Sequence, residues 1–166
     1  MKYQVVYKSL SGNTALVAQA IADALPTEQT ELINFQAQTP TKCADVYFIG
    51  FAVRHGICSL EMLNFLGTLD NKTIFLFATC GLYPDSTALE RAIRSFLPDT
   101  CRYLGLHLCQ GAISDTGVQA LKRRFSANSD QLSPQHLESL FTDAACHPNE
   151  NDLYSAKSFA LSALSL

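Results

Sequence analysis

The stretch Ser9-Leu10-Ser11-Gly12-Asn13-Thr14 lies between an apolar run at residues 3–7 and a helical pattern that begins near residue 15. It contains three hydroxyls, one side-chain amide and one glycine. A turn between a strand and a helix points successive backbone N–H groups into one concavity, with the positive end of the helix dipole behind it. Gly12 permits a tight turn and the close approach of a ligand. The stretch therefore predicts an anion-binding loop.

No lysine or arginine lies inside this loop, so neutral donors would hold the anion. That suits a terminal monoester phosphate better than a triphosphate with magnesium. The same residues are also typical of an ordinary helix N-terminus, in which Ser11 or Asn13 caps the helix and no ligand binds. The six residues alone leave both interpretations open.

Composition sets the class of protein. The chain has 166 residues, 48% of them hydrophobic, with a net charge of −3, and we expect one domain over residues 1–166. This charge gives no reason to expect binding to nucleic acid or to a membrane surface. The basic cluster Lys122-Arg123-Arg124 is short, and we expect it to lie at a helix C-terminus. The chain shows no signal peptide or membrane-spanning run, which predicts a cytoplasmic protein.

The six cysteines contain no C-x-x-C pair, which argues against a zinc knuckle or a thioredoxin-type site. We expect most of them to be reduced core residues. Five apolar runs predict strands at residues 3–7, 31–35, 45–51, 72–78 and 103–113. Helical spacing predicts helices at residues 16–25, 60–66, 86–97 and 153–164, and we expect mostly helical, turn-rich segments at residues 118–125 and 134–146. Ser86 is the expected cap of one helix, and Asn151 or Asp152 of the last.

Alternation of strands and helices predicts right-handed crossovers and a doubly wound, mainly parallel sheet with helices on both faces. Ligands of such sheets bind beyond the carboxyl ends of the strands. The loops after the first, third and fourth strands, at residues 9–14, 52–59 and 79–85, would meet at that edge. Their convergence favours the anion-binding interpretation over the capping one.

The chain resembles the flavodoxin family at this point. Its first loop is similar to the family's S/T-x-S/T-G-x-T phosphate signature for FMN. Flavodoxin is the standard example of a protein that binds FMN at the carboxyl edge of such a sheet, where the strand order reverses. The segments Gly50-Phe-Ala-Val-Arg-His-Gly56 and Ala78-Thr-Cys-Gly-Leu-Tyr-Pro84 resemble the two that sandwich the isoalloxazine ring. The resemblance implies a short-chain, flavodoxin-like three-layer sandwich. It would have a five-stranded parallel sheet of order 2-1-3-4-5 and extra C-terminal helices.

The resemblance also implies FMN-binding residues, and no catalytic or metal-ligating ones. The first loop would hold the phosphate, Gly56 would place a peptide near flavin N5, Tyr83 would stack on the ring, and residues 79–81 would contact the pyrimidine edge. A half-buried tyrosine in a turn is the alternative for Tyr83. The implied set is Ser9, Leu10, Ser11, Gly12, Asn13, Thr14, Ala52, Val53, Arg54, His55, Gly56, Thr79, Cys80, Gly81 and Tyr83.

Two departures from the family stand out. Relatives often have a tryptophan where this chain has Ala52, and this chain has no tryptophan at all, so one stacking surface for the flavin is missing. Arg54 and His55 place basic side chains where typical flavodoxins are acidic, which predicts a less reducing flavin if they reach the ring. A solvated loop without electrostatic reach is the alternative. Cys80 is either redox-active or merely small, and we favour small.

The leading functional interpretation is an FMN-binding electron carrier that docks transiently with a reductase donor and an acceptor enzyme at the flavin rim. One alternative is an NAD(P)H-dependent FMN or quinone reductase on the same fold. Another is a flavin-free interaction module. The chain has no C-x5-R phosphatase spacing, no G-x-G-x-x-G fingerprint, no Walker A lysine and no paired acids of a receiver domain.

Overall fold

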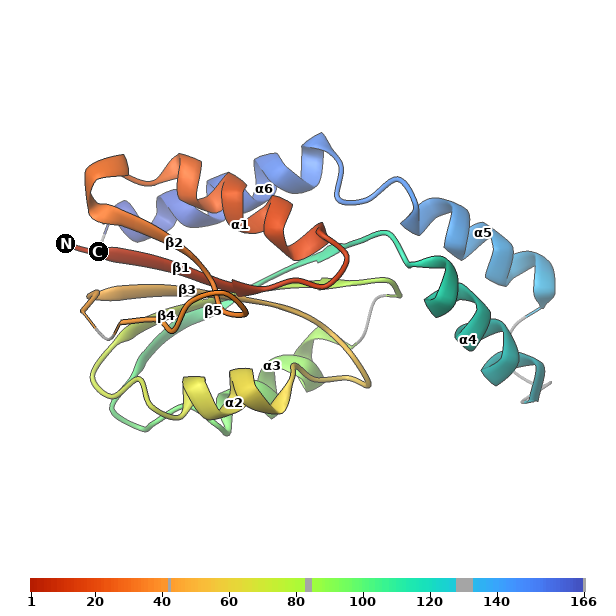
Figure 1. The fold of residues 1–166 in the computed structure, drawn as a ribbon, viewed down its shortest axis with the longest axis horizontal. Helices are drawn as coiled ribbons and strands as arrows, with labels where there is room; N and C mark the ends of the chain where they lie inside the picture. Colours follow the sequence, from red (N-terminus) through yellow and green to blue (C-terminus); the bar gives the residue numbers. More distant parts are fainter. Residues whose placement is uncertain (42, 83–84, 128–132, 166) are drawn as a thin grey trace.

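The computed structural model describes residues 1–41, 43–82, 85–127 and 133–165. Its strands form one parallel sheet in the order β2-β1-β3-β4-β5, as predicted (Figure 1). The strands are β1 (Tyr3–Lys8), β2 (Thr30–Asn34), β3 (Val46–Ala52), β4 (Thr73–Cys80) and β5 (Arg102–Gln110).

Two pairs of helices cover the two faces of the sheet, and a third pair lies beyond its edge. Helices α1 (Asn13–Ala24) and α6 (Glu150–Leu161) cover one face of the sheet, and α2 (Leu60–Leu66) and α3 (Ser86–Arg94) cover the other (Figure 1). Helices α4 (Asp115–Ala127) and α5 (Pro134–Ala144) lie beyond the carboxyl ends of the strands, away from both layers. Short 3-10 helices occupy Thr27–Gln29 and Ser162–Ser165.

The central strands are buried on both faces, which explains their unbroken apolar sequences. In β3, Phe48 faces the α1 and α6 side, and its ring stacks on Phe75 with centroids 4.7 Å apart. The alternate residue Ile49 packs in the cluster beneath α2 and α3. Gly50 lies so close to the ring of Phe77 that a β-carbon would meet it at 2.0 Å, so this strand position excludes a side chain.

The strand register aligns the carboxyl ends of the central strands and of β5. Each central strand ends beside the end of its neighbour, in the pairs Lys8 with Phe51, Ala52 with Thr79, and Cys80 with Gln110. The loops that follow β1, β3, β4 and β5 therefore leave the sheet at the same edge.

Local capping differs from two predictions. Asp85, not Ser86, caps α3, because its carboxylate accepts a hydrogen bond from the Ala88 N–H at 3.0 Å. Asn149, not Asn151 or Asp152, caps α6. Its side chain accepts the N–H of both of those residues, while the Asp152 carboxylate accepts the Asn149 N–H at 2.8 Å, which completes a capping box.

Candidate functional site

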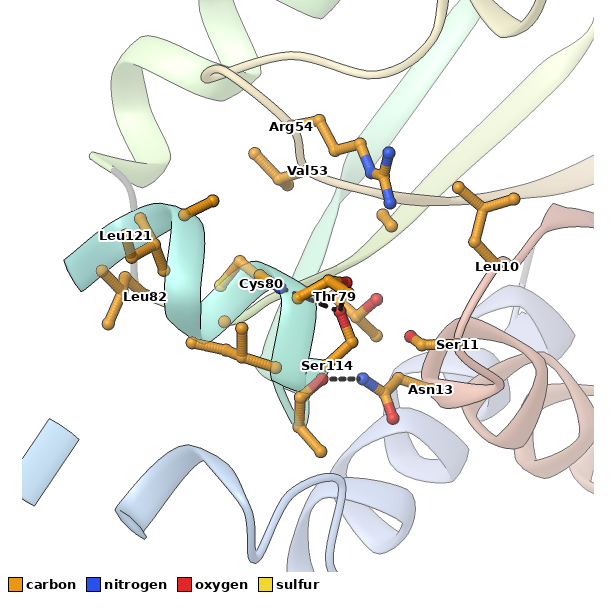
Figure 2. A pocket seen from close by; sticks show the side chains of 18 of the residues that line it. Leu10, Ser11, Asn13, Val53, Arg54, Thr79, Cys80, Leu82, Ser114 and Leu121 are labelled. Atoms are coloured by element: carbon orange, nitrogen blue, oxygen red, sulfur yellow. Dashed lines mark hydrogen bonds between the residues drawn. The ribbon is translucent and has the colours of Figure 1, made fainter. Parts of the chain in front are cut away.

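A cavity of about 800 Å³ lies at the carboxyl edge of the sheet (Figure 2). Cavities that hold small ligands measure about 300–1,000 Å³, so this one has a suitable size. Its walls come from the loops after β1, β3, β4 and β5 and from α4. The lining residues are Leu10, Ser11, Asn13, Ala52, Val53, Arg54, His55, Gly56, Thr79, Cys80, Gly81, Leu82, Gly111, Ala112, Ile113, Ser114, Thr116, Gly117, Ala120, Leu121 and Arg124.

The first loop leaves the N-terminus of α1 without a side-chain cap. Gly12 is the N-cap residue, in the left-handed conformation at φ 93°, and its N–H donates to the Ser9 hydroxyl at 3.1 Å. The interpretation of Ser11 or Asn13 as the cap is therefore wrong. Because no side chain accepts the first N–H groups of this helix, its N-terminus keeps the donors and the dipole that attract an anion.

Asn13 joins the first loop to the end of β5. Its side-chain amide donates to the Ala112 carbonyl at 2.8 Å, as the dashed line in Figure 2 marks. The Ala112 N–H in turn donates to the His147 carbonyl at 2.7 Å. A β-carbon on Gly111 would lie 2.7 Å from the Asn13 amide nitrogen, so this contact requires glycine there. The contact therefore fixes the N-terminus of α1 against the segment that follows β5.

Thr14 is buried, although the resemblance places it on the phosphate. Its side chain is 1% exposed, and its hydroxyl lies 2.8 Å from the hydroxyl of Thr79 in β4. Thr14 therefore contributes a buried link between α1 and β4 and does not line the cavity. Ser9 and Gly12 also lie outside the lining, whereas Leu10, Ser11 and Asn13 belong to it.

The loop after β3 is a tight turn whose tip reaches the cavity. Arg54 and Ile57 exchange backbone hydrogen bonds of 2.9 and 3.2 Å across it. His55 and Gly56 between them have φ values of 53° and 82°, the signature of a type I′ turn. Glycine is favoured at the second of these positions because a β-carbon there strains the backbone. All five predicted residues of this loop, Ala52 to Gly56, line the cavity.

The loop after β4 packs tightly against the end of β5. Gly81 leaves no room for a β-carbon, which would lie 2.3 Å from Ile113, and its carbonyl accepts the side-chain amide of Gln110 at 3.2 Å. Burial raises the pKa of the Cys80 thiol to about 12, so the thiol stays protonated at neutral pH. This supports the interpretation of Cys80 as a small core residue. The predicted Tyr83 lies outside the described residues.

Sequence reasoning missed the wall formed by the end of β5 and by α4. This wall supplies apolar groups from Ile113 and Leu121, and Leu121 lies near Leu82 of the preceding loop (Figure 2). Since β5 ends at the same edge as its neighbours, the rule used for the other loops also applies to the residues after it; the apolar run predicted a strand as far as residue 113, whereas β5 ends at Gln110. Arg124 lies in the last turn of α4, as predicted for the basic cluster, but it also lines the cavity.

The electrostatics of the cavity favour an anion. Arg54 and Arg124 line it, and none of the described residues that line it is acidic. Together with the uncapped N-terminus of α1, they make a positive site with apolar walls, which matches a phosphorylated aromatic ligand. In the described ranges of the chain, no cluster of histidine, cysteine and acidic residues is arranged to hold a metal ion. None of the described helices has the length and apolar character needed to span a bilayer.

Curated relatives match nearly the whole chain. It is 29% identical over 168 residues to the flavodoxin-like domain-containing protein BilS of Clostridioides difficile strain CD3, covering 96% of this chain and 94% of that protein. It is 23% identical to the BilS protein of Clostridium symbiosum strain WAL-14163, covering 99% of this chain and 96% of the relative.

Solved structures show the same fold. The flavodoxin of Megasphaera elsdenii superposes with a TM-score of 0.53 at 17% identity, over 86% of this chain and 98% of that one. A flavoprotein of Lactobacillus acidophilus NCFM in complex with FMN gives a TM-score of 0.51 at 14% identity, over 74% of this chain and 97% of that one. The family model of the flavodoxin domain matches residues 4–161. Since this match spans nearly the whole chain and the sheet has the order expected of that fold, the chain belongs to the flavodoxin domain family.

Proposed function

We propose that this protein binds FMN in the cavity and carries electrons from a reductase to a partner redox enzyme. The observation that supports this most directly is a positive cavity at the uncapped N-terminus of α1, in which Arg54 and Arg124 line the wall and no described lining residue is acidic. Bound FMN would supply the electron-transfer chemistry, and the protein supplies position and electrostatics. The known FMN complex of a structural neighbour is consistent with this cofactor.

The residues present fit the two ends of the cofactor. Ser11 is exposed in the first loop and lines the cavity, so its hydroxyl and the free N–H groups of the first helical turn would hold the phosphate. The apolar side chains of Val53 and Leu121 line the part of the cavity suited to the ring (Figure 2). Ala52 also lines it and offers no aromatic surface, so we expect moderate rather than very tight affinity.

A titration with FMN and with riboflavin tests this assignment. Absorbance and flavin fluorescence measure both affinities, and riboflavin lacks only the phosphate. Ser11→Asp places a carboxylate beside the expected phosphate, and we expect it to weaken FMN binding about tenfold or more while riboflavin binding changes little.

Ser59→Asp is the matched control. Ser59 precedes α2 at the same edge of the sheet, makes no side-chain cap and lies outside the cavity lining, so the control adds the same charge near the same place. We expect it to leave FMN affinity within about twofold. Equal affinity for FMN and riboflavin in the unaltered protein, or equal losses in both variants, would contradict the phosphate assignment.

The same preparation separates the alternative functions. Rapid oxidation of NADPH by the purified FMN-loaded protein alone favours the reductase interpretation over the carrier. A protein that takes up neither FMN nor riboflavin favours the interaction module. A carrier requires that the flavin be reduced by a separate reductase and reoxidised by an acceptor. The proposal includes a cytoplasmic location and transient docking of both partners at the cavity rim.

A further inference from the structure

The arginines around the cavity form a basic surface on a chain whose net charge is −3. We call Arg54, Arg123 and Arg124 the basic rim. Arg54 and Arg124 line the cavity from two different walls, the turn after β3 and the last turn of α4. Arg123 is the exposed neighbour of Arg124 in α4. The helix that projects beyond the sheet therefore carries the chain's one basic cluster to the mouth of the site.

Neighbouring carboxylates leave these charges uncompensated. Lys122, the third member of the cluster, pairs with Glu138 of α5 at 2.5 Å. No ion pair to Arg54, Arg123 or Arg124 is formed by the acidic residues within the described ranges. Asp115 lies at the opposite end of α4, where it complements the helix N-terminus, and it does not line the cavity.

Exposed leucines accompany the arginines at this edge. Leu10, in the loop after β1, lines the cavity and is 60% exposed. Leu60 begins α2 and is 70% exposed. An ion pair between Lys8 and Glu61 joins the end of β1 to the first turn of α2, so both leucines lie near the same edge. Apolar anchors within a charged rim are the usual composition of a protein docking surface.

We infer that the basic rim docks a redox partner whose contact surface is acidic. This inference rests on the proposed function, because the rim surrounds the cavity assigned to FMN. Opposite charges accelerate encounter and orient the partner, whereas the net negative charge of the chain alone would repel an acidic protein. The local charge at the site, not the net charge, would then select the partner.

Paramagnetic ions measure the local charge without any cofactor. The hexacyanochromate(III) trianion broadens amide signals where the surface attracts anions, and the tris(ethylenediamine)chromium(III) trication does so where it attracts cations. In the cofactor-free protein at low ionic strength, we expect the trianion to broaden the amides of residues 54–56 and 123–124 selectively. Selective broadening of these amides by the trication, or by neither ion, would overturn the inference.

Electron transfer from the FMN-loaded protein gives a second measurement. After reduction with dithionite, the protein passes single electrons to ferricyanide or to the tris(phenanthroline)cobalt(III) cation. We expect the rate with ferricyanide to fall as salt is added and the rate with the cobalt cation to rise, because salt screens attraction in the first case and repulsion in the second. The opposite pair of slopes would follow from the net charge and would reject the basic rim.

A charge-reversal pair sharpens both measurements. Arg123→Glu with Arg124→Glu should slow ferricyanide about threefold or more at low salt and abolish broadening by the trianion around α4. The control pair is Arg102→Glu with Lys157→Glu, which makes the same change in net charge at the start of β5 and on α6. We expect the control pair to keep the rate within about twofold of the unaltered protein.

The outcomes separate this inference from the proposed function. If the protein takes up no FMN, the electron-carrier proposal fails, and the chromium ions alone decide whether the rim is basic. If FMN binds and the salt slopes follow the net charge, only the docking inference fails.

The class of partner is tested by titration with two model ligands. A hexaglutamate peptide should shift the NMR signals of the amides of the basic rim at low salt. If a single-stranded oligonucleotide shifts them and the peptide does not, the partner is a nucleic acid and the inference is wrong.

Discussion

Replacing Thr14 by valine removes one half of a buried hydroxyl pair and tests where that side chain points. The Thr14 hydroxyl lies 2.8 Å from that of Thr79, and the two residues are 1% and 3% exposed. Valine keeps the shape and the β-branch of threonine, and the two residues have nearly equal helix propensity. The substitution therefore isolates the hydrogen bond.

The expected magnitude follows from the burial of the pair. With Thr14→Val, the Thr79 hydroxyl loses its partner at a residue that is only 3% exposed, which costs about 1–3 kcal/mol of unfolding free energy. Thr79→Val should cost a similar amount for the same reason. The double variant removes both hydroxyls, so it should lie within about 1 kcal/mol of the unaltered protein. Because the two single losses together amount to about 2–6 kcal/mol and the double variant loses at most about 1 kcal/mol, the cycle predicts a coupling energy of roughly 1–6 kcal/mol.

Urea unfolding followed by circular dichroism measures these changes. With a slope of about 2 kcal/mol/M, each single variant should lower the midpoint by about 0.5–1.5 M with an unchanged slope. Thr142→Val makes the same substitution at an exposed position of α5 and should change the free energy by less than about 0.5 kcal/mol. Additive losses in the double variant would refute the pairing.

FMN affinity of Thr14→Val, measured where the variant is fully folded, then decides between the structure and the family motif. Because the Thr14 hydroxyl faces Thr79 and Thr14 does not line the cavity, we expect this variant to bind FMN within about threefold of the unaltered protein. A loss of about tenfold or more in the folded variant would show that the Thr14 hydroxyl holds the phosphate, as the resemblance implies.

Four further predictions address single residues. Gly111→Ala should displace the Asn13 amide, which lies 2.7 Å from the new β-carbon, and lower the unfolding free energy measured in urea by about 1–3 kcal/mol; an unchanged urea midpoint would contradict the contact. The Cys80 thiol, with its pKa raised to about 12 by burial, should resist a disulfide reagent at pH 8 while the exposed cysteines react; native labelling at this position would refute its burial. Burial lowers the pKa of His107 below its ordinary value of 6.5, against an opposing effect of the Asp152 carboxylate. The unfolded chain therefore binds the proton more tightly, and stability should fall as pH drops below 6.5; His107→Phe should reduce that fall, and an equal fall in both proteins would exclude this cause. Arg54→Ala should lower the reduction potential of bound FMN by about 20–60 mV, the equivalent of roughly 0.5–1.4 kcal/mol for one electron, and an unchanged or raised potential rejects the electrostatic reach of this side chain.

The local sequence determined the sheet and pointed to three of the loops that line the cavity. Apolar runs such as residues 45–51 predicted a parallel sheet covered by helices on both faces, and the structure confirms it. The strand order, which the structure also confirms, was implied by the resemblance to the flavodoxin family. Gly12 and Gly56 marked the two turns at the cavity because their positive φ values suit a residue without a β-carbon. These features depend on backbone conformation and periodicity, which neighbouring residues set.

Tertiary packing alone decided where the side chains of the site point. Nothing in the first loop distinguishes the hydroxyl of Thr14 from that of Ser11, yet one is buried against β4 and the other lines the cavity. Likewise, Lys122-Arg123-Arg124 predicted only a helix end, and the placement of α4 beyond the sheet brings Arg124 to the cavity. Sequence spacing indicates the period of a strand or helix. The contacts of Thr14 with Thr79 and of Asn13 with Ala112 join residues 65 or more positions apart, so only the assembled sheet brings them together.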